Sequence, residues 1–436
     1  MAGEWTTLPL EDCMAAIIDY RGKSPEKTTF GVPLVTAKIV KGGRIEKPEE
    51  FIAEADFEDW MRRGMPEPGD IVMTTEAPLG EVAQLDGRKV ALAQRVITLR
   101  GKPDVLDNTF LKFLLQSNPV QEELRSRGTG TTVVGIRQSE LRKISLTLPP
   151  LAEQKAIAAV LGALDDKIEL NRRMNATLEA MARALFQSWF VDFDPVRAKL
   201  DGRKPVGMDS ATAALFPDQF HESELGQIPS GWHIGRIRDE VEDVFDGPHA
   251  TPSESAEGPV FLGIKNLTGA ALDLTKINHI SESDWPRWTR RVTPRHLDIV
   301  FSYEATLGFF ALIPPHLRCC LGRRLALIRT KSSHGYPHFW FHQFVGTDFQ
   351  RYLIQHSVQG ATVDRVPLIQ FPNYRVLSPP QNIKAAFEER AAPLWSKIHA
   401  NNSQSQTLIT LRDTLLPKLL SGELSASKTK IRSTHD

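Results

Sequence analysis

The fold is decided by residues 149–190, which read PPLAEQKAIAAVLGALDDKIELNRRMNATLEAMARALFQSWF. After the two prolines, small or apolar residues and two asparagines recur at alternating steps of four and three. This is the heptad pattern of a long helix that packs along one seam. We therefore expect one helix over 151–190, with the seam formed by Ile157, Leu161, Leu164, Ile168, Asn171, Asn175, Leu178, Ala182, Leu185 and Trp189.

The same pattern returns after Pro379-Pro380, at Phe387, Ala391, Leu394, Ile398, Asn401, Ser405, Leu408, Arg412, Leu415 and Leu419. Asn171 and Asn401 occupy the same place in the two seams, and a polar seam residue fixes register and partner at a cost in stability. The sequence predicts that the two helices pair antiparallel as a coiled coil, mainly through Leu161, Leu164, Ile168, Asn171, Leu178, Leu185, Leu394, Ile398, Asn401, Leu408 and Leu415. Two ordinary amphipathic helices in separate cores are the alternative, which leaves the matched seams unexplained.

The rest of the chain is a faint internal repeat. Residues 70–72, Asp-Ile-Val, match residues 298–300, and residues 74–80 match residues 302–308, at a common offset of 228. Further matches follow in the same order at offsets between 227 and 230, including Arg95 with Arg324 and the two Pro-Pro pairs. A collinear series of this kind indicates duplication.

Each repeat begins with short strand-like runs, Gly/Pro turns and one later helix, which indicates an α+β fold. The predicted order is a first head over 1–150, a helix over 151–190, a linker over 191–230, a second head over 231–380 and a helix over 381–424. We expect the linker to be extended. The Ser/Lys/Thr-rich tail 425–436 is predicted to be disordered. From 157 to 189 the first helix would be roughly 50 Å long at ~1.5 Å per residue and would hold the heads apart.

Composition excludes several classes of protein. The chain of 436 residues has 41% hydrophobic and 24% charged residues, which is typical of a globular protein of two or three domains. No apolar run approaches the roughly 20 residues of a membrane helix, and no secretory signal is visible. The three cysteines cannot form a disulfide framework, so we expect a reduced, cytoplasmic protein.

Catalytic motifs are missing. There is no P-loop, no dinucleotide-binding fingerprint and no C-x-x-C pair for zinc. Asp165-Asp166-Lys167 and Glu153-Gln154-Lys155 resemble the acid-x-Lys of nucleases, but both lie on the heptad helix, where charge is normally solvated. His334, His338 and His342 have helical spacing, yet Gly335 and Pro337 interrupt the start, so a hydrogen-bonded role is favoured over a metal. We predict no catalytic residue and no metal site in this chain.

Arginines are clustered although the net charge is zero, with 53 Lys+Arg against 53 Asp+Glu. Arginine is the usual residue for bidentate contact with guanine and for phosphate, so these clusters are candidates for a nucleic-acid face. Solvated surface arginines are the alternative. The candidates are Arg95, Arg125, Arg127, Arg137, Arg287, Arg290, Arg291, Arg323 and Arg324, and Arg329 belongs to the same clusters.

Four stretches resemble the specificity subunits of type I restriction–modification systems. Residues 148–190 resemble the central conserved region of that family, residues 191–195 and 223–232 its linker, and residues 415–424 its C-terminal end. The resemblance covers essentially the whole chain. One departure is Asn382-Ile383, where the first repeat has Glu153-Gln154.

The resemblance implies a non-catalytic subunit that reads DNA. Each head would be a target recognition domain for one half of a split, asymmetric double-stranded target. The helices would dock two methyltransferase subunits, and restriction (translocase–nuclease) subunits could join. In that complex, a site-specific deoxyribonuclease and adenine methyltransferase, the partner subunits would bind S-adenosylmethionine, ATP and Mg²⁺, and this chain would bind no cofactor. A coiled-coil scaffold whose heads bind protein is the alternative, and a stand-alone nuclease is a weaker one.

Overall fold

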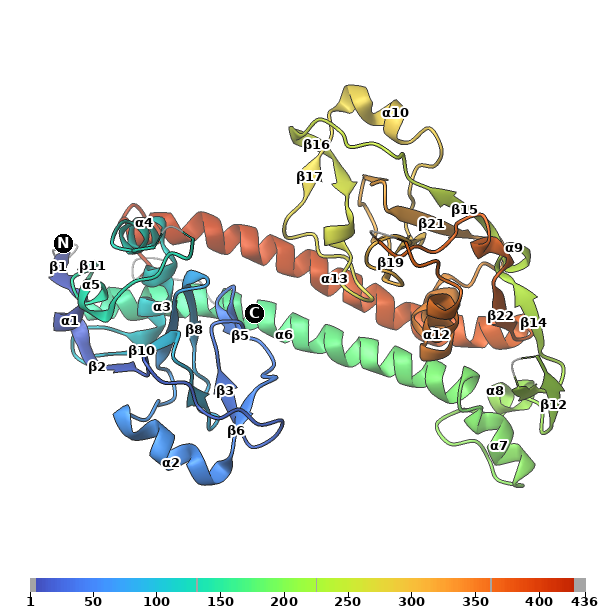
Figure 1. The fold of residues 1–436 in the computed structure, drawn as a ribbon, viewed down its shortest axis with the longest axis horizontal. Helices are drawn as coiled ribbons and strands as arrows, with labels where there is room; N and C mark the ends of the chain where they lie inside the picture. Colours follow the sequence, from blue (N-terminus) through green and yellow to red (C-terminus); the bar gives the residue numbers. More distant parts are fainter. Residues whose placement is uncertain (1–4, 131, 225, 361–362, 427–436) are drawn as a thin grey trace, which may run out of the picture. The chain divides into compact units, whose positions relative to one another are not determined.

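The structure is a computed structural model that describes residues 5–130, 132–224, 226–360 and 363–426 (Figure 1). The chain forms two compact units. Unit 1 consists of Met1–Leu170 and Gln404–Asp436, and unit 2 consists of Asn171–Ser403. Each unit contains one head and one part of each long helix. None of the described helices has the length and apolar character needed to cross a membrane.

The head of unit 1 is built on a four-stranded antiparallel sheet in the order β2-β10-β7-β8. Its strands are Met14–Asp19, Val96–Gly101, Ile71–Thr75 and Leu79–Gln84 in that order. A second sheet has the order β6-β3-β9, with strands Phe51–Ile52, Val32–Val35 and Ala91–Leu92. β1 (Thr6–Pro9) pairs antiparallel with β11 (Ser145–Leu148), so the start and end of the head lie together.

Helices cover the main sheet because their apolar faces are continuous with its core. In α3 (Asn108–Gln116) the side chain of Asp107 caps the first turn by accepting from the Phe110 amide at 2.9 Å. The buried side of α3 joins Ile71, Met73, Ile97 and Leu99 in one cluster. The remaining elements of this head are α1 (Leu10–Cys13), β4 (Val40–Lys41), β5 (Arg44–Ile45), η1 (Glu54–Asp56), α2 (Phe57–Trp60), η2 (Met61–Arg63), α4 (Asn118–Ser126) and α5 (Gln138–Leu141).

The head of unit 2 repeats this topology. Its main sheet has the order β15-β21-β18-β19, formed by Val241–Asp246, Leu325–Thr330, Ile299–Ser302 and Phe310–Leu312. The second sheet is β17-β16-β20, formed by Asn278–His279, Ser255–Leu262 and Cys319–Leu321, and in both heads its central strand has one antiparallel and one parallel neighbour. The duplication predicted from the sequence is therefore confirmed at the level of strand order.

The other elements of unit 2 keep the same correspondence. β14 (His233–Arg236) pairs with β22 (Arg375–Ser378), as β1 pairs with β11. The helices α11 (Pro337–Val345) and α12 (Thr347–Gln355) take the places of α3 and α4. The remaining elements are α9 (Ile237–Glu240), η3 (Ile264–Asn266), η4 (Glu282–Asp284), α10 (Trp285–Trp288) and η5 (Phe371–Asn373).

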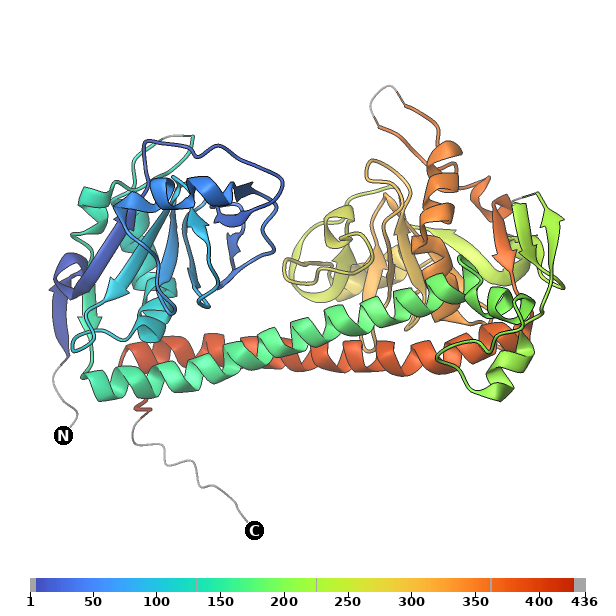
Figure 2. The same ribbon diagram turned by 90° about the horizontal axis from the view of Figure 1, so that it is seen from below.

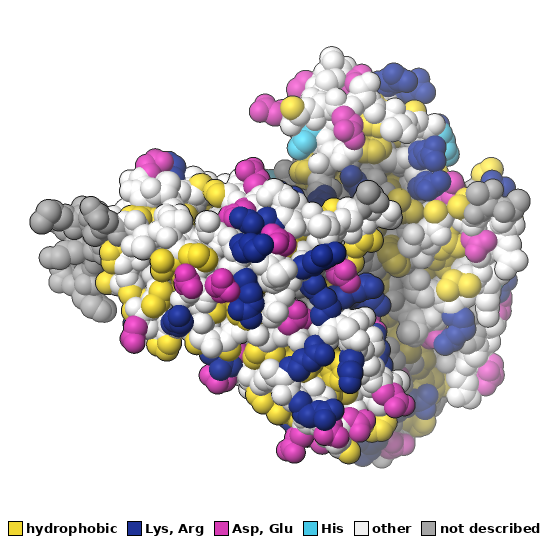
Figure 3. Space-filling model, turned by 60° about the vertical axis from the view of Figure 1, so that its left-hand side comes forward, with side chains coloured by type: hydrophobic (Ala, Val, Ile, Leu, Met, Phe, Trp, Pro, Cys, Tyr) yellow, Lys and Arg dark blue, Asp and Glu magenta, His cyan; other side chains and the backbone are white. Residues whose placement is uncertain are grey.

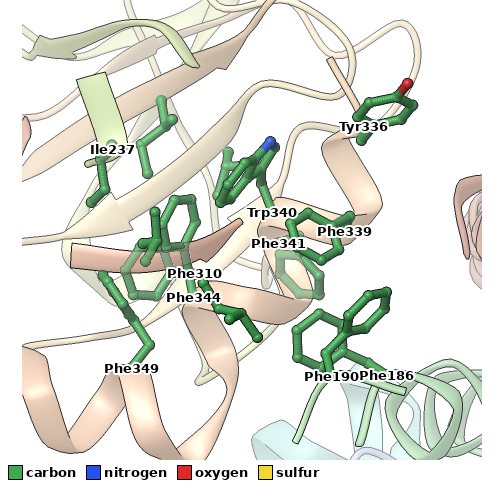
Figure 4. Close-up of a cluster of buried hydrophobic side chains, with 14 of the residues drawn as sticks. Phe186, Phe190, Ile237, Phe310, Tyr336, Phe339, Trp340, Phe341, Phe344 and Phe349 are labelled. Carbon is green, nitrogen blue, oxygen red and sulfur yellow. The ribbon is translucent and has the colours of Figure 1, made fainter. Parts of the chain in front are cut away.

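The core of unit 2 is unusually aromatic. Phe186 and Phe190 of α6 lie against Phe339 of α11, with ring centroids 5.7 and 5.0 Å apart (Figure 4). Phe310 and Phe344 stack at 5.5 Å beneath the sheet. Aromatic side chains bury large areas and prefer such offset or edge contacts, so this cluster attaches the head to the helix segments of its own unit.

The two long helices pair antiparallel in each unit, as predicted. Both α6 (Leu151–Phe190) and α13 (Gln381–Leu420) are 40 residues long. In unit 1, Ile157 shares a core cluster with Leu419. In unit 2, the rings of Phe186 and Phe387 lie 5.7 Å apart. Early residues of one helix thus meet late residues of the other, and each predicted seam position is buried or half-buried (Figures 1 and 2).

The segment 191–230 corrects one expectation. It is not extended: it contains α7 (Asp194–Leu200), α8 (Ser210–Leu215) and the hairpin of β12 (Phe220–Ser223) with β13 (Gly226–Pro229). Its apolar residues are too few to show a period in the sequence, but Val196, Phe216 and Ile228 are buried in the core of unit 2. The predicted disordered tail lies outside the described residues from residue 427 onward.

Candidate nucleic-acid interface

One end of the main sheet of head 1 brings an arginine and a glutamate together. Glu76 directly follows β7 and Arg95 directly precedes β10, and these strands are antiparallel neighbours with Thr74 opposite Val96. The two residues are therefore adjacent, and Nε of Arg95 lies 3.0 Å from Oε1 of Glu76. Their side chains are 53% and 42% exposed, so the pair lies on the surface.

A loop closes over this sheet end. Thr129 and Gly135 exchange two backbone hydrogen bonds of 2.8 and 3.0 Å, and Gly135 also bridges to Glu76. The next amide, that of Ile136, donates to the Thr75 carbonyl at 2.9 Å. The main chain of Glu76 is thus held between strand β10 and the loop, which fixes where its side chain begins.

Two further arginines join the same end of head 1, and no sequence pattern had singled them out. Arg21, just after β2, donates from Nη2 to the Ile136 carbonyl at 2.7 Å. Arg63 donates from Nη1 to the carbonyls of Asp19 and Arg21, at 3.0 and 2.8 Å. These bonds connect residues far apart in the sequence, so only the tertiary structure identifies them. Sheet end 1 is defined here as Arg21, Arg63, Glu76, Arg95 and loop 129–136, of which residue 131 is outside the described part.

Head 2 has the same construction. Nε of Arg324 lies 3.4 Å from Oε1 of Glu304, and both side chains are about a third exposed, at 31% and 29%. Glu304 bridges to Arg365, which pairs with Val358 across a loop as Gly135 pairs with Thr129. Arg291 corresponds to Arg63. Its Nη1 lies 2.5 Å from a carboxylate oxygen of Asp246, at the end of β15. Sheet end 2 is defined here as Arg291, Glu304, Arg324 and loop 358–365, of which residues 361–362 are outside the described part.

The residue immediately before the glutamate differs between the two sheet ends. Thr75 of head 1 corresponds to Tyr303 of head 2, whose hydroxyl donates to the Arg323 carbonyl at 2.8 Å. Burial, with Asp246 and Glu304 nearby, raises the pKa of Tyr303 to about 12, so this hydroxyl stays protonated and remains a donor. Equivalent backbones therefore present different side chains.

Arg329 does not lie on the candidate surface. It forms a bidentate pair with Asp298, at 3.0 and 2.6 Å, and the two side chains are only 11% and 5% exposed. Head 1 repeats the pair between Arg100 and Asp70, with two contacts of 2.8 Å. Each pair lies at the opposite end of its strand from Arg95 or Arg324. A buried carboxylate needs such a partner, so these arginines serve the fold.

The other predicted arginines are distributed around the heads. Arg125, Arg137, Arg287, Arg290 and Arg323 are exposed, while Arg127 is half-buried. Arg127 is held by two carboxylates, with Nε 3.0 Å from Glu123 and Nη1 3.5 Å from Glu140. Arg137 directly follows loop 129–136, and Arg323 directly precedes Arg324. Arg290 likewise directly precedes Arg291, so these three are the other predicted arginines that adjoin the sheet ends in sequence.

Charge on the heads is mixed. Figure 3 shows Lys and Arg side chains gathered on the forward face of unit 1, with Asp and Glu among them. Glu76, Glu304 and Asp246 offset part of the arginine charge at the sheet ends. Long-range attraction to phosphate is therefore weak, and geometry rather than net charge distinguishes these surfaces.

The helix-pairing residues enclose a polar centre in unit 2. Nδ2 of Asn401 donates to Oδ1 of Asn175 at 2.8 Å, and Nδ2 of Asn171 donates to the Asn401 carbonyl at 3.4 Å. Asn175 also donates to Oδ1 of Asn402 at 2.7 Å. Asn171 and Asn401 are buried, at 0% and 2% exposure. These directional bonds fit only one alignment of the two helix segments.

The three spaced histidines do not converge. His334 precedes α11, and Nδ1 of His338 bonds to Glu388 at 2.6 Å. His342 accepts from the indole of Trp395 at 3.2 Å, and burial lowers its pKa to about 3. Within the described ranges, no group of three or more His, Cys, Asp or Glu residues could hold a metal ion.

The fold and the two sheet ends define a class: a duplicated protein whose two like α/β heads each carry an arginine–glutamate surface and pack on an antiparallel helix pair. Known proteins with similar sequences were found in the comparisons that follow, and all are described as type I restriction specificity proteins. The profile described as "Type I restriction modification DNA specificity domain" matches residues 33–180. The type I restriction enzyme MjaIX specificity subunit of Methanocaldococcus jannaschii is 27% identical over 90% of this chain and 87% of its own length.

Two further likenesses extend this result. The HindI specificity subunit of Haemophilus influenzae is 25% identical over 72% of this chain and 77% of its own length. The crystal structure of a type I restriction–modification S subunit from M. genitalium superposes with a TM-score of 0.56 at 17% identity, over 95% of this chain and 96% of that one, and so shows the same fold. The matched profile and both of these relatives are thus described as type I restriction–modification DNA specificity domains or specificity subunits, and the chain is similar to them.

Proposed function

We propose that this chain reads a split, asymmetric DNA target, with one head on each half. The observation that carries the proposal is the repetition of one surface on two different heads. Both sheet ends place an arginine–glutamate pair at the same topological position, while neighbouring residues such as Thr75 and Tyr303 differ. A shared scaffold with different side chains suits two different half-sites, because base contacts specify and phosphate contacts position.

The chain would act in a complex in the cytoplasm rather than alone, and without a catalytic step of its own. Its balance of 53 basic and 53 acidic residues gives little sequence-independent attraction to DNA, so partner subunits would supply much of the phosphate contact. Two methyltransferase subunits would dock on the helix pair, and restriction subunits would join them. S-adenosylmethionine, ATP and Mg²⁺ would bind to those partner subunits.

Exposed apolar side chains on the long helices support partner docking. Leu170 and Leu411 in unit 1 are 51% and 45% exposed, and Met181 in unit 2 is 53% exposed. All three lie off the seam, on surfaces that the antiparallel pairing does not cover. Large apolar side chains outside the packed seam are the kind of residue that subunit interfaces bury.

A head exchange tests the proposal. The chain is coexpressed with its methyltransferase partner, and methylated bases are mapped across the host genome. Replacing residues 231–380 with the equivalent head of a relative should change one half of the target and preserve the other. A change in both halves together would contradict independent heads. A complex that binds no DNA but captures a protein through its heads would favour the scaffold alternative.

A further inference from the structure

The arginine–glutamate pair contributes too little to the stability of the fold for stability to explain its presence in both heads. Exposed ion pairs typically contribute ~0–1 kcal/mol, because solvent screens the charges and the side chains lose freedom. The fold already has a strong pair on the same strands, between Arg100 and Asp70 and between Arg329 and Asp298. The pair recurs in head 2, where its side chains are half-buried at 31% and 29% exposure, and its repetition in both heads calls for another role.

Other matched positions have diverged freely, which makes this repetition informative. Lys112 of α3 corresponds to Phe341 of α11, and Asp165 of α6 corresponds to Trp395 of α13. At the sheet ends, in contrast, the arginine, the glutamate, the carboxylate contact to Nε and the loop bridge are all repeated. The two heads thus share this surface feature, although their buried contacts with the long helices differ.

The geometry suits one base pair. In the part of the chain that the structure describes, neither Arg95 nor Arg324 donates a hydrogen bond from its Nη atoms, while a carboxylate sits beside each Nε. Nε of Arg324 is buried and has no hydrogen-bond partner among the described residues, so only the ion pair holds its guanidinium beside Glu304. A guanidinium placed in this way can present its two Nη groups to O6 and N7 of guanine. The adjacent carboxylate is an acceptor for the N4 amino group of cytosine, and both edges face the major groove.

We propose that Arg95 with Glu76, and Arg324 with Glu304, each read one G·C base pair in the half-site of their own head. The arginine contacts the guanine and the glutamate contacts the paired cytosine. Gly135 and Arg365, which bridge to the two glutamates, fix the backbone position from which each carboxylate extends. This inference rests on the proposed function and names the base pair that the two sheet ends recognise.

The test uses the complex of this chain with its methyltransferase partner and duplexes in which each base pair of the mapped target is substituted in turn. Arg95→Lys keeps the charge but loses the bidentate fork. It should lower discrimination at one G·C position of the first half-site about ten-fold or more and leave the second half-site unchanged. Glu76→Gln should relax the same position, because it removes the anionic acceptor. Arg324→Lys and Glu304→Gln should do the same in the second half-site only.

Glu67→Gln is the matched control, because Glu67, in the loop before β7, contacts Arg100 of β10 at 2.5 Å and is 61% exposed. It should change neither half-site. Thermal unfolding should be unaltered in all five variants, so a lost preference cannot reflect a lost fold. If a Glu76 or Glu304 variant unfolds, the corresponding Arg→Lys variant decides.

Three results would overturn the inference. One is a mapped target with a half that contains no fixed G·C pair. Another is a uniform loss of affinity over all sequences in the Arg→Lys variants, which would mean phosphate contact alone. The third is unchanged discrimination. In these cases the wild-type complex still binds its target and the proposed function stands, whereas a wild-type complex with no sequence preference would overturn both.

Discussion

Asp165 of α6 accepts a hydrogen bond from Arg412 of α13 at 2.9 Å, and its other carboxylate oxygen contacts Lys112 of α3. One carboxylate therefore joins both long helices and the head within unit 1. The three side chains are only 10–22% exposed. The matching positions in unit 2 are Trp395, Ala182 and Phe341, where the Phe341 and Trp395 rings meet edge to face at 5.0 Å. The same junction is ionic in one unit and apolar in the other.

Removing the shared carboxylate should destabilise unit 1. In Asp165→Ala, Lys112 and Arg412 would remain partly buried without their common partner. We expect a loss of about 2–4 kcal/mol in the free energy of unfolding, seen as a lower-melting transition in calorimetry. The control is Asp166→Ala, because Asp166 is the exposed neighbour on the same helix. Equal melting of the two variants would contradict a role for the junction.

Transplanting the apolar junction should preserve the fold. A triple variant, Lys112→Phe, Asp165→Trp and Arg412→Ala, gives unit 1 the residues of unit 2. Well-packed apolar replacements of buried ion pairs are often neutral or stabilising, so the triple variant should be more stable than Asp165→Ala alone. Its melting temperature should also depend less on salt between 0.05 and 0.5 M NaCl. A salt dependence equal to that of the wild type would count against an ionic junction.

Acid should weaken unit 2 through its buried histidines. Burial, followed by the nearby charges of His338 and Arg183, lowers the pKa of His342 to about 3, and burial lowers that of His399 to about 4. The unfolded chain takes up these protons below its ordinary histidine pKa of about 6.5, while the folded chain does not. Stability from these groups is therefore complete above pH 6.5 and falls as the pH decreases from 6.5 toward 4.

His342→Phe tests that pH dependence, because unit 1 has Phe113 at the matching position. The variant loses the acceptor of the Trp395 indole, so its stability at pH 7 should decrease by about 1 kcal/mol. The decrease between pH 7 and pH 5 should nevertheless be smaller than in the wild type. Chemical unfolding of both proteins at the two pH values measures this difference, and parallel curves would refute it.

Substitutions of Arg329 and Arg323 should have different effects on head 2, the first on stability and the second on DNA binding. Arg329→Met leaves Asp298 buried without its cation, so unit 2 should lose about 3–5 kcal/mol. Arg323→Ala, at an exposed position beside Arg324, should change stability by less than about 0.5 kcal/mol. Under the proposed function it should weaken DNA binding. Thermal unfolding together with DNA titration distinguishes the two, and a reversed order would contradict the assignment.

Predictions made from the sequence succeeded where a pattern extends over many residues. The heptad seams with Asn171 and Asn401 predict the long paired helices, because a helix repeats its contacts every three or four residues. The collinear offsets predict the common strand order. The prediction of an extended linker was wrong for the opposite reason. The helices α7 and α8 and the β12–β13 hairpin are too short to show a period in the sequence, and Val196 and Phe216 are held by contacts with the core of unit 2.

For the candidate surface, the sequence by itself determined that arginines are abundant in both heads and that Arg95 matches Arg324. It could not determine which arginines face outward. Arg95 and Arg100 lie at opposite ends of one strand. Arg100 is structural because it pairs with the buried Asp70, whereas Arg95 is exposed and pairs with Glu76 at the surface. Such pairing depends on which strand ends become neighbours. The sequence thus determined the repeat and the helices, whereas the tertiary structure decided the surface, because strand neighbours are set by long-range packing and leave no local pattern.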